Sequence, residues 1–424
     1  MTPFAAWMLE QEARALLTRL GRVKPFALIE PMVPAASLPI NAQGATERYL
    51  VEGRRELRDM VLGFIAWLRG PGGSQATPAQ AQRRFSILRL KFNAVLTQFD
   101  MFADVISQRS EHDTGVFLSG LDVVASDALT LPDKYYTAPP LICYLDRGAG
   151  AAIRRARTRL PGGGLNPVGI IRVPRERMVG SGIASSLIHE VGHQAAALLD
   201  LTTSLRMQIQ GMQRGRGGRA WKLFDRWIGE IVSDFWSCAR LGITATLGLI
   251  SVVSLPRPFV FRLSPDDPHP APWIRVHLSC AMGQAMFPHE QWARLSQLWN
   301  SFYPIEGNDL TRRELFDEIF AAMPGFVGLL VNHRPPALRG RSLQEVLQVA
   351  QRQPAHLTAL FAAWQRQPSQ MYRTPPTLVF AVLGQARADG HLSPEEESHL
   401  LTKLLSHWAL RNAVSVTVPR VSSS

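Results

Sequence analysis

Two histidines and a glutamate within residues 185–194 have the types and spacing needed to hold and use a metal ion. His189 and His193 are four residues apart, so on a helix they lie one turn apart on the same face and can direct two imidazole nitrogens to one ion. Glu190 lies beside them, where its carboxylate can hydrogen-bond a water on that ion. Apolar residues recur at spacings of three and four from 183 to 198, which predicts a helix. The pattern H-E-x-x-H on a helix is the arrangement of zinc hydrolases.

A pair of buried histidines on an ordinary core helix is the alternative interpretation of this segment. A chance H-E-x-x-H is expected in roughly one in a hundred chains of this size and composition. A catalytic zinc site also needs a third protein ligand and an open position for water. The metzincin class would supply that ligand as a histidine at 199, with a glycine at 196. Ala196 and Leu199 stand there instead, which excludes that class.

A carboxylate from a second helix is the remaining source of the third ligand. Helical periodicity from 221 to 241 includes Glu230 and Asp234, which are four residues and therefore one turn apart. Glu230 can reach the ion, while Asp234 can accept the outer N–H of a ligand histidine and set its tautomer. The alternative is a solvated pair of helix acids.

H-E-x-x-H followed by E-x-x-x-D on a later helix resembles the gluzincin clan of zinc metallopeptidases, which includes thermolysin. The resemblance covers roughly residues 165–280. It implies Zn²⁺ bound by His189, His193 and Glu230, with Glu190 as general base and Asp234 supporting a ligand. It also implies a peptide or protein substrate. A catalytically inactive zincin-fold scaffold or binding module is the alternative function.

The segment 264–275 is rich in proline and resembles an H-P stretch with a later arginine in several gluzincin families. His269 and Arg275 are therefore candidates to stabilise the oxyanion of a tetrahedral intermediate. The alternative is a rigid loop whose histidine caps a helix. A tyrosine near the ion is a further candidate, and the sequence leaves three open: Tyr135, Tyr136 and Tyr144.

Two short apolar runs, residues 141–145 and 168–174, predict strands ahead of the metal-site helix. Pro167 and Pro174 bound the second run, which favours an edge strand because proline cannot donate to a sheet. In zinc peptidases an edge strand beside the active helix commonly binds extended peptide. The second strand is thus either a substrate-binding edge or an ordinary one.

The remaining periodicity predicts an α+β chain that is mostly helical. A zincin-like core with a small mixed sheet is expected at 115–305, between helical regions at 1–114 and 306–424. The first region shows helical patterns at 5–20, 45–69 and 79–108. Within the last region, residues 370–412 resemble the TerB-like helical fold on a short motif.

A capping box and an excluded calcium loop define the end of the chain. Ser393, Pro394 and Glu396 have the types expected at N-cap, N1 and N3 of a helix. An EF-hand alignment of this loop would place Gln385 and Arg387 at its first and third positions. Calcium needs oxygen ligands there, largely carboxylates, so calcium binding is excluded.

The charge of the chain allows a nucleic-acid partner without requiring one. Lys and Arg number 46 against 34 Asp and Glu, giving a formal net charge of +12. Basic residues cluster at 154–159, 172–177 and 214–219. Such clusters can attract nucleic acid, and a DNA-associated basic protease is a second alternative function. No nucleic-acid motif accompanies them, so solvated arginines are the simpler interpretation.

Neither a membrane span nor an export signal is expected. The longest uncharged stretch, residues 241–256, is short for a span and predicts a buried helix. Acidic residues interrupt the first twenty positions, which is unlike a signal peptide. The three cysteines are widely spaced and suggest neither a disulfide framework nor a thiolate zinc site. A cytoplasmic location is predicted.

Overall fold

The computed structural model describes residues 1–148, 150–175, 180–213, 218–264 and 266–417. The chain is mostly helical and contains a three-stranded mixed sheet, which confirms the predicted class at that level. In chain order the elements are α1 (Pro3–Arg22), α2 (Ile40–Arg69), α3 (Pro71–Gln75), α4 (Pro78–Ser107), α5 (His112–Leu129), β1 (Leu141–Asp146), β2 (Ala152–Arg154), β3 (Gly169–Pro174), α6 (Gly182–Leu198), α7 (Leu201–Met212), α8 (Gly218–Leu241), α9 (Ile243–Val253), α10 (Arg257–Val260), α11 (Pro272–Met286), α12 (Glu290–Phe302), α13 (Leu310–Val331), α14 (Leu343–Val346), α15 (Pro354–Arg366), α16 (Pro376–Ala388) and α17 (Pro394–Thr417).

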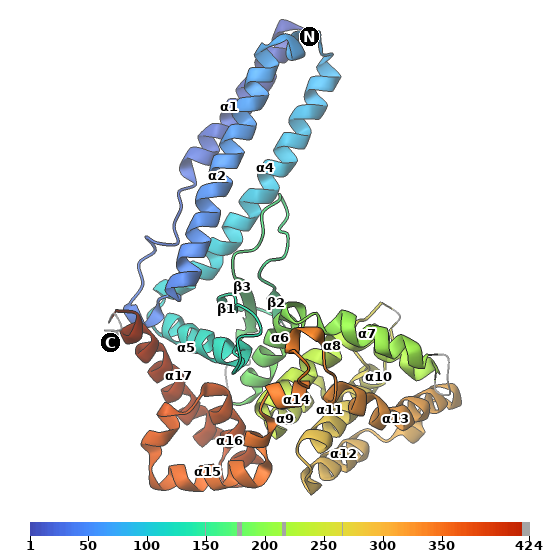
Figure 1. The fold of residues 1–424 in the computed structure, drawn as a ribbon. Coiled ribbons are helices and arrows are strands. Elements are labelled where there is room, and N and C mark those ends of the chain that lie inside the picture. Colours follow the sequence, from blue (N-terminus) through green and yellow to red (C-terminus); the bar gives the residue numbers. More distant parts are fainter. Residues whose placement is uncertain (149, 176–179, 214–217, 265, 418–424) are drawn as a thin grey trace.

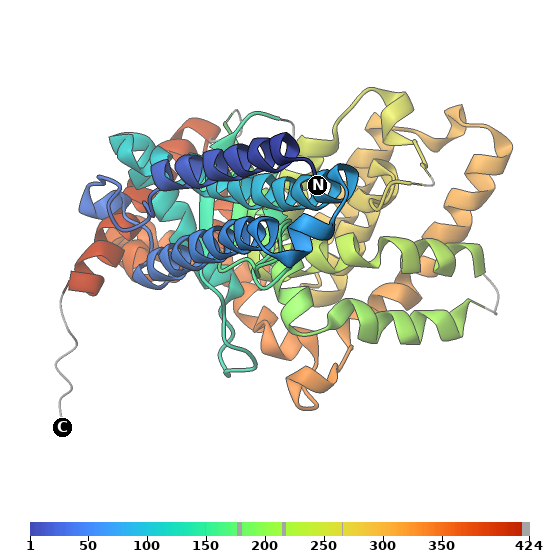
Figure 2. The same cartoon turned by 90° about the horizontal axis from the view of Figure 1, so that it is seen from above.

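Helices α1, α2 and α4 form a long arm that projects from the rest of the molecule, with the N-terminus at its far end (Figure 1). Viewed from above, the three helices run side by side (Figure 2). Buried side chains such as Leu16, Phe64 and Phe85 give the arm its own apolar core. Helix α4 begins with a capping box, in which Thr77 and Gln80 each accept a hydrogen bond from the other's backbone N–H. The three helices predicted in this region are confirmed.

The sheet has the order β1-β3-β2, with β1 parallel and β2 antiparallel to β3. Both predicted strands are present, but the prediction that the second is an edge strand is wrong. Strand β3 is central because β2, which sequence analysis missed, pairs with its other side. Pro167 precedes β3 and Pro174 is its last residue, so neither missing N–H interrupts the middle of the ladder.

Helix α6 follows β3 and packs closely against α8, and this contact positions the candidate metal ligands. Gly192 lies at the crossing. A Cβ on Gly192 would come within 2.8 Å of the Ser233 Cα and 3.0 Å of the Ser233 carbonyl oxygen. Only glycine therefore allows the two backbones to approach this closely. The approach brings the side chains of α8 onto the face of α6 that carries His189 and His193.

One large apolar core includes side chains from α5, the sheet and the helices from α6 to α17. Helix α17 returns to pack along α5, as Figure 1 shows. The core therefore contains residues from both sides of the predicted boundary near 305, and the domain boundaries stay predictions.

Two local expectations are confirmed: Ser393 and Glu396 form the capping box of α17, and most of residues 241–256 forms the largely buried helix α9. No helix of the described ranges is long and apolar enough to cross a membrane.

A buried ion pair joins the sheet to the helix behind it. Arg109 is fully buried, and its guanidinium contacts both carboxylate oxygens of Asp122 at 3.0 and 3.2 Å. The same guanidinium donates to the Cys143 carbonyl at 2.6 Å, and the Cys143 N–H donates to Asp122 at 2.7 Å. These bonds fix β1 on α5.

Replacing Asp122 by Ala should destabilise the fold, because it leaves the Arg109 guanidinium buried without a counter-charge. The expected loss is about 3–5 kcal/mol in the free energy of unfolding, measured by urea denaturation. Asp113→Ala is the matched control on the same helix, since the Asp113 side chain is fully exposed. A loss below about 1 kcal/mol for Asp122→Ala would contradict this role for the pair.

Candidate metal centre

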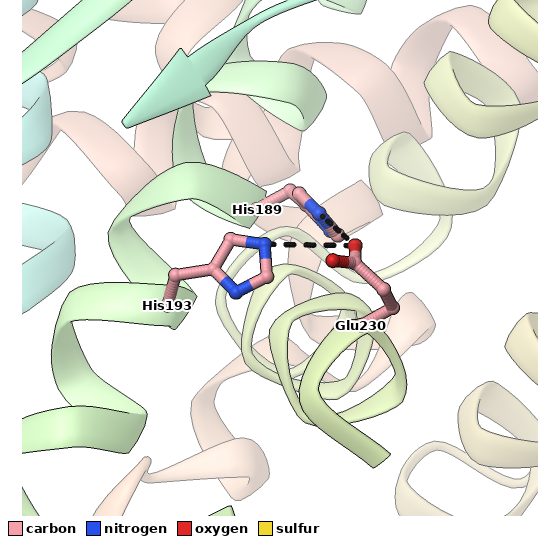
Figure 3. A group of neighbouring side chains, drawn as sticks. All are labelled: His189, His193 and Glu230. Atoms are coloured by element: carbon pink, nitrogen blue, oxygen red, sulfur yellow. Dashed lines mark hydrogen bonds and ion pairs between the residues drawn. The ribbon is translucent and has the colours of Figure 1, made fainter. Parts of the chain in front are cut away.

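Three side chains from two helices converge on one point (Figure 3). His189 and His193 of α6 direct their Nε2 atoms at the Glu230 Oε2 of α8, at 3.2 and 3.5 Å. The three potential ligand atoms lie within 4.8 Å of one another. Ligand atoms bound to a tetrahedral zinc ion at its usual distances lie roughly 3.4 Å apart. The arrangement therefore fits a zinc ion with only small side-chain adjustments.

Asp234 sets the orientation of the first histidine. Its Oδ1 lies 2.8 Å from the His189 Nδ1, so it can accept the Nδ1–H and leave Nε2 facing Glu230. This carboxylate–imidazole contact is the usual support of a histidine that ligates a metal. The structure thus places Asp234 where the sequence interpretation expected it, one helical turn from Glu230.

The centre is electrostatically built to hold positive charge. Burial alone would lower the pKa of His189, but Asp234 and Glu230 outweigh it and raise that pKa to about 9. Burial would likewise raise the pKa of Glu230, yet hydrogen bonds with the three surrounding histidines hold it well below its usual range. The carboxylates therefore stabilise a cation at this point, whether a proton or a metal ion.

Arg275 acts on Asp234 in this structure. Its Nε and Nη2 donate to the two oxygens of Asp234 at 2.6 and 2.8 Å, which is a bidentate pair. Burial would raise the pKa of Asp234, but Arg275 and His189 hold it well below its usual range. Arg275 is thus a positioning residue for the Asp234–His189 contact, and its predicted action on an oxyanion stays a prediction.

His269 lies at the rim of the centre. Its Nε2 is 3.2 Å from Glu230 Oε2, and its Nδ1 is 2.8 Å from Asp267 Oδ1. The hydrogen bond with Glu230 raises the pKa of His269, although burial opposes the shift. Helix α11 begins after it without a side-chain cap, so the alternative of a capping histidine does not describe this loop. About half of the side chain is exposed, so His269 faces the open side of the centre.

Two cavities meet at Glu190. The larger, of ≈ 770 Å³, is lined by His193 and Glu230 and by residues of β2. The smaller, of ≈ 200 Å³, extends between α6 and α9. Glu190 lines both, beside the metal-site histidines, where a general base would have to lie. None of the three candidate tyrosines is among the residues that line these cavities.

Two features of the site were not predicted from sequence. One is strand β2 beside the centre, and the other is the group of serine hydroxyls that line the smaller cavity: Ser185, Ser186, Ser237 and Ser279. Strand β2 is three residues long with a largely exposed pattern, so it carries no apolar alternation that could have predicted it. His277 of α11 is not part of the centre, because both nitrogens of its ring are bonded to α12, one to Ser296 and one to Asn300.

The arginines of the three basic clusters lie in different surroundings. Arg155 lines the larger cavity, and Arg219 pairs with Glu318 at 2.6 Å. Arg177, Arg214 and Arg216 lie outside the described residues. The structure thus adds no support for a nucleic-acid partner, which stays an alternative prediction.

Comparison of this chain with models of protein families, with curated proteins and with solved structures gives no match.

Proposed function

We propose that this chain is a zinc-dependent metallopeptidase with a zincin-type core within residues 115–305. The observation that carries the proposal is the shared Glu230 oxygen, which faces the Nε2 atoms of His189 and His193 at once. Asp234 supports this set from the far side of His189. Two imidazoles and one carboxylate, each oriented by its helix, form a donor set that suits catalytic zinc.

Each remaining residue of the centre has a role in peptide hydrolysis. A bound zinc ion would polarise the scissile carbonyl and lower the pKa of a water towards about 7. Glu190 takes the proton of the attacking water and passes it to the leaving amine. His269, held by Asp267, donates a hydrogen bond to the carbonyl oxygen as negative charge develops there. Arg275 keeps Asp234 ionised and in contact with His189.

Strand β2 supports an extended peptide as substrate. One edge of β2 pairs with β3, and its other edge has no strand partner among the described residues. Ala152 and Ile153 of this strand line the larger cavity together with His193. A peptide can therefore add to the free edge of β2 by main-chain hydrogen bonds and pass over Glu190. We therefore assign to β2 the substrate-binding role that the sequence suggested for residues 168–174, which form β3.

The role of His269 predicts a selective loss of rate. His269→Ala should lower the rate of peptide hydrolysis about a hundredfold or more while zinc content stays near that of wild type. His289→Ala is the matched control, because His289 lies outside both cavities at the start of α12. If His269→Ala keeps the wild-type rate and only lowers the melting temperature, His269 stabilises the fold and does not act in catalysis.

Removal of the metal tests the proposed function as a whole. We expect purified protein to contain about one zinc per chain and to cleave peptides. A chelator should abolish cleavage, and added zinc should restore it. Cleavage that survives complete removal of zinc would contradict the proposal. Bound zinc without cleavage of any peptide would favour the inactive scaffold instead.

A further inference from the structure

The smaller cavity has no role in the mechanism described above. It lies between α6, α8, α9 and α11 and shares four lining residues with the larger cavity: Ala151, His189, Glu190 and His269. Because the two spaces join at the catalytic centre, a peptide held in the larger one can direct one side chain into the smaller. Its ≈ 200 Å³ is less than the roughly 300–1,000 Å³ of pockets for whole small molecules. The space therefore suits a single side chain.

The walls of this cavity are held by close helix packing. The Ser185 hydroxyl donates to the Ala245 carbonyl at 3.0 Å, and the Ser237 hydroxyl donates to the Ser185 carbonyl at 3.3 Å. A Cβ on Gly248 would lie 2.4 Å from the Ser185 Cβ, so α6 and α9 are in direct contact there. A substrate cannot widen the cavity at this wall without breaking these contacts, and its size therefore limits what enters.

The lining offers no free charge to a substrate side chain beyond the catalytic centre itself. Asp234 and Arg275 are the charged groups of the inner wall, and they pair with each other through two hydrogen bonds. A charged substrate side chain would lose its water there and find no free counter-charge, which is costly. The other side chains of the inner wall are aliphatic or carry hydroxyls: Ser185, Ser186, Ser237, Ala245, Leu249, Val252 and Ser279.

Ser186 is the lining residue best placed to set this preference. It precedes Glu190 by one turn of α6, so both face the same side of the helix. Its hydroxyl has no hydrogen-bond partner among the described residues, whereas Ser185, Ser237 and Ser279 are each bonded within the protein. A substitution at Ser186 therefore changes the cavity without breaking an internal hydrogen bond.

We infer that this cavity selects an uncharged side chain, aliphatic or hydroxyl-bearing, on the residue next to the cut peptide bond, and that Ser186 determines the selection. The inference rests on the proposed peptidase function. It states the class of substrate: peptides with a medium-sized uncharged residue at one flank of the cleavage site.

The test is a cleavage profile of the zinc-loaded full chain on a proteome-derived peptide library, read by mass spectrometry. Wild type should cut beside uncharged medium-sized residues. Ser186→Asp should raise the share of cuts beside Lys and Arg by about tenfold or more, because it adds a counter-charge. Ser186→Leu should shift cuts towards Gly and Ala by a similar factor, because it fills the space. Ser301→Asp is the control, since Ser301 is exposed on α12 and lines neither cavity.

A binding measurement on Glu190→Gln supplies a readout that needs no turnover. This protein should bind a peptide with leucine at the selected position at least about tenfold more tightly than the same peptide with lysine. Cleavage by wild type without residue preference, or an unchanged profile in both Ser186 variants, would overturn the inference and leave the peptidase intact. No cleavage by wild type would contradict the peptidase proposal itself and the inference with it.

Discussion

Glu230→Ala should lose most of its zinc, because it leaves two imidazoles as the only protein ligands of the centre. Asp234→Ala should be milder, with a loss of about 10–100-fold in zinc affinity or activity, since Asp234 orients a ligand and does not reach the ion. The loss of zinc affinity in Glu230→Ala should be larger than the loss in Asp234→Ala. Zinc affinity is measured by competition with a chromogenic chelator on the purified variants.

The gradient between the two substitutions is the decisive part of this prediction. Asp225→Ala is the control, because Asp225 lies on the same helix, pairs with Arg206 at 2.8 Å and lines neither cavity. Its zinc affinity should equal that of wild type. If Glu230→Ala binds zinc as tightly as wild type, the third ligand is a different residue, and the gluzincin interpretation is wrong.

Glu190→Gln should keep near-stoichiometric zinc and lose about 10²–10⁴-fold in the rate of peptide hydrolysis. The amide has the shape of the carboxylate but cannot accept the proton of the attacking water. Zinc is retained because Glu190 is not among the three converging ligand residues. Steady-state hydrolysis and metal analysis on the same protein sample measure both quantities.

The control for this variant is Glu290→Gln, the same chemical change at an exposed position on α12. It should leave rate and zinc content unchanged. Full activity in Glu190→Gln would exclude Glu190 as the base. Loss of zinc together with activity would mean that Glu190 is a zinc ligand, which would contradict its role as general base.

The parts of the site predicted from sequence are those that depend on local helix geometry. The four-residue spacings of His189 with His193 and of Glu230 with Asp234 place each pair on one helix face, whatever surrounds them. The long helices of the arm follow from periodicity in the same way. The sequence could suggest only by resemblance that the face of α6 with the two histidines meets the face of α8 with the two acids. That depends on the tertiary contact of α6 with α8, which Gly192 permits.

The errors have a common physical origin in partners distant along the chain. Prolines before and at the end of β3 favoured an edge position, but pairing with β2 on one side and β1 on the other makes this strand central. Strand β2 has only three residues, all at least partly exposed, which is too little signal to predict a strand from sequence. The action of Arg275 on an oxyanion stays a prediction. The structure adds a contact that its sequence position could not reveal, in which Nε and Nη2 of Arg275 donate to Asp234, 41 residues away along the chain.

Diffraction at the zinc absorption edge from crystals of the zinc-loaded protein would test the central claim most directly. The account predicts one anomalous peak about 2.0–2.2 Å from the Nε2 atoms of His189 and His193 and from a carboxylate oxygen of Glu230, with no fourth protein ligand. Absence of a peak at these three residues would contradict the metal centre. A peak also bonded to His269 would contradict the open position on which hydrolysis depends.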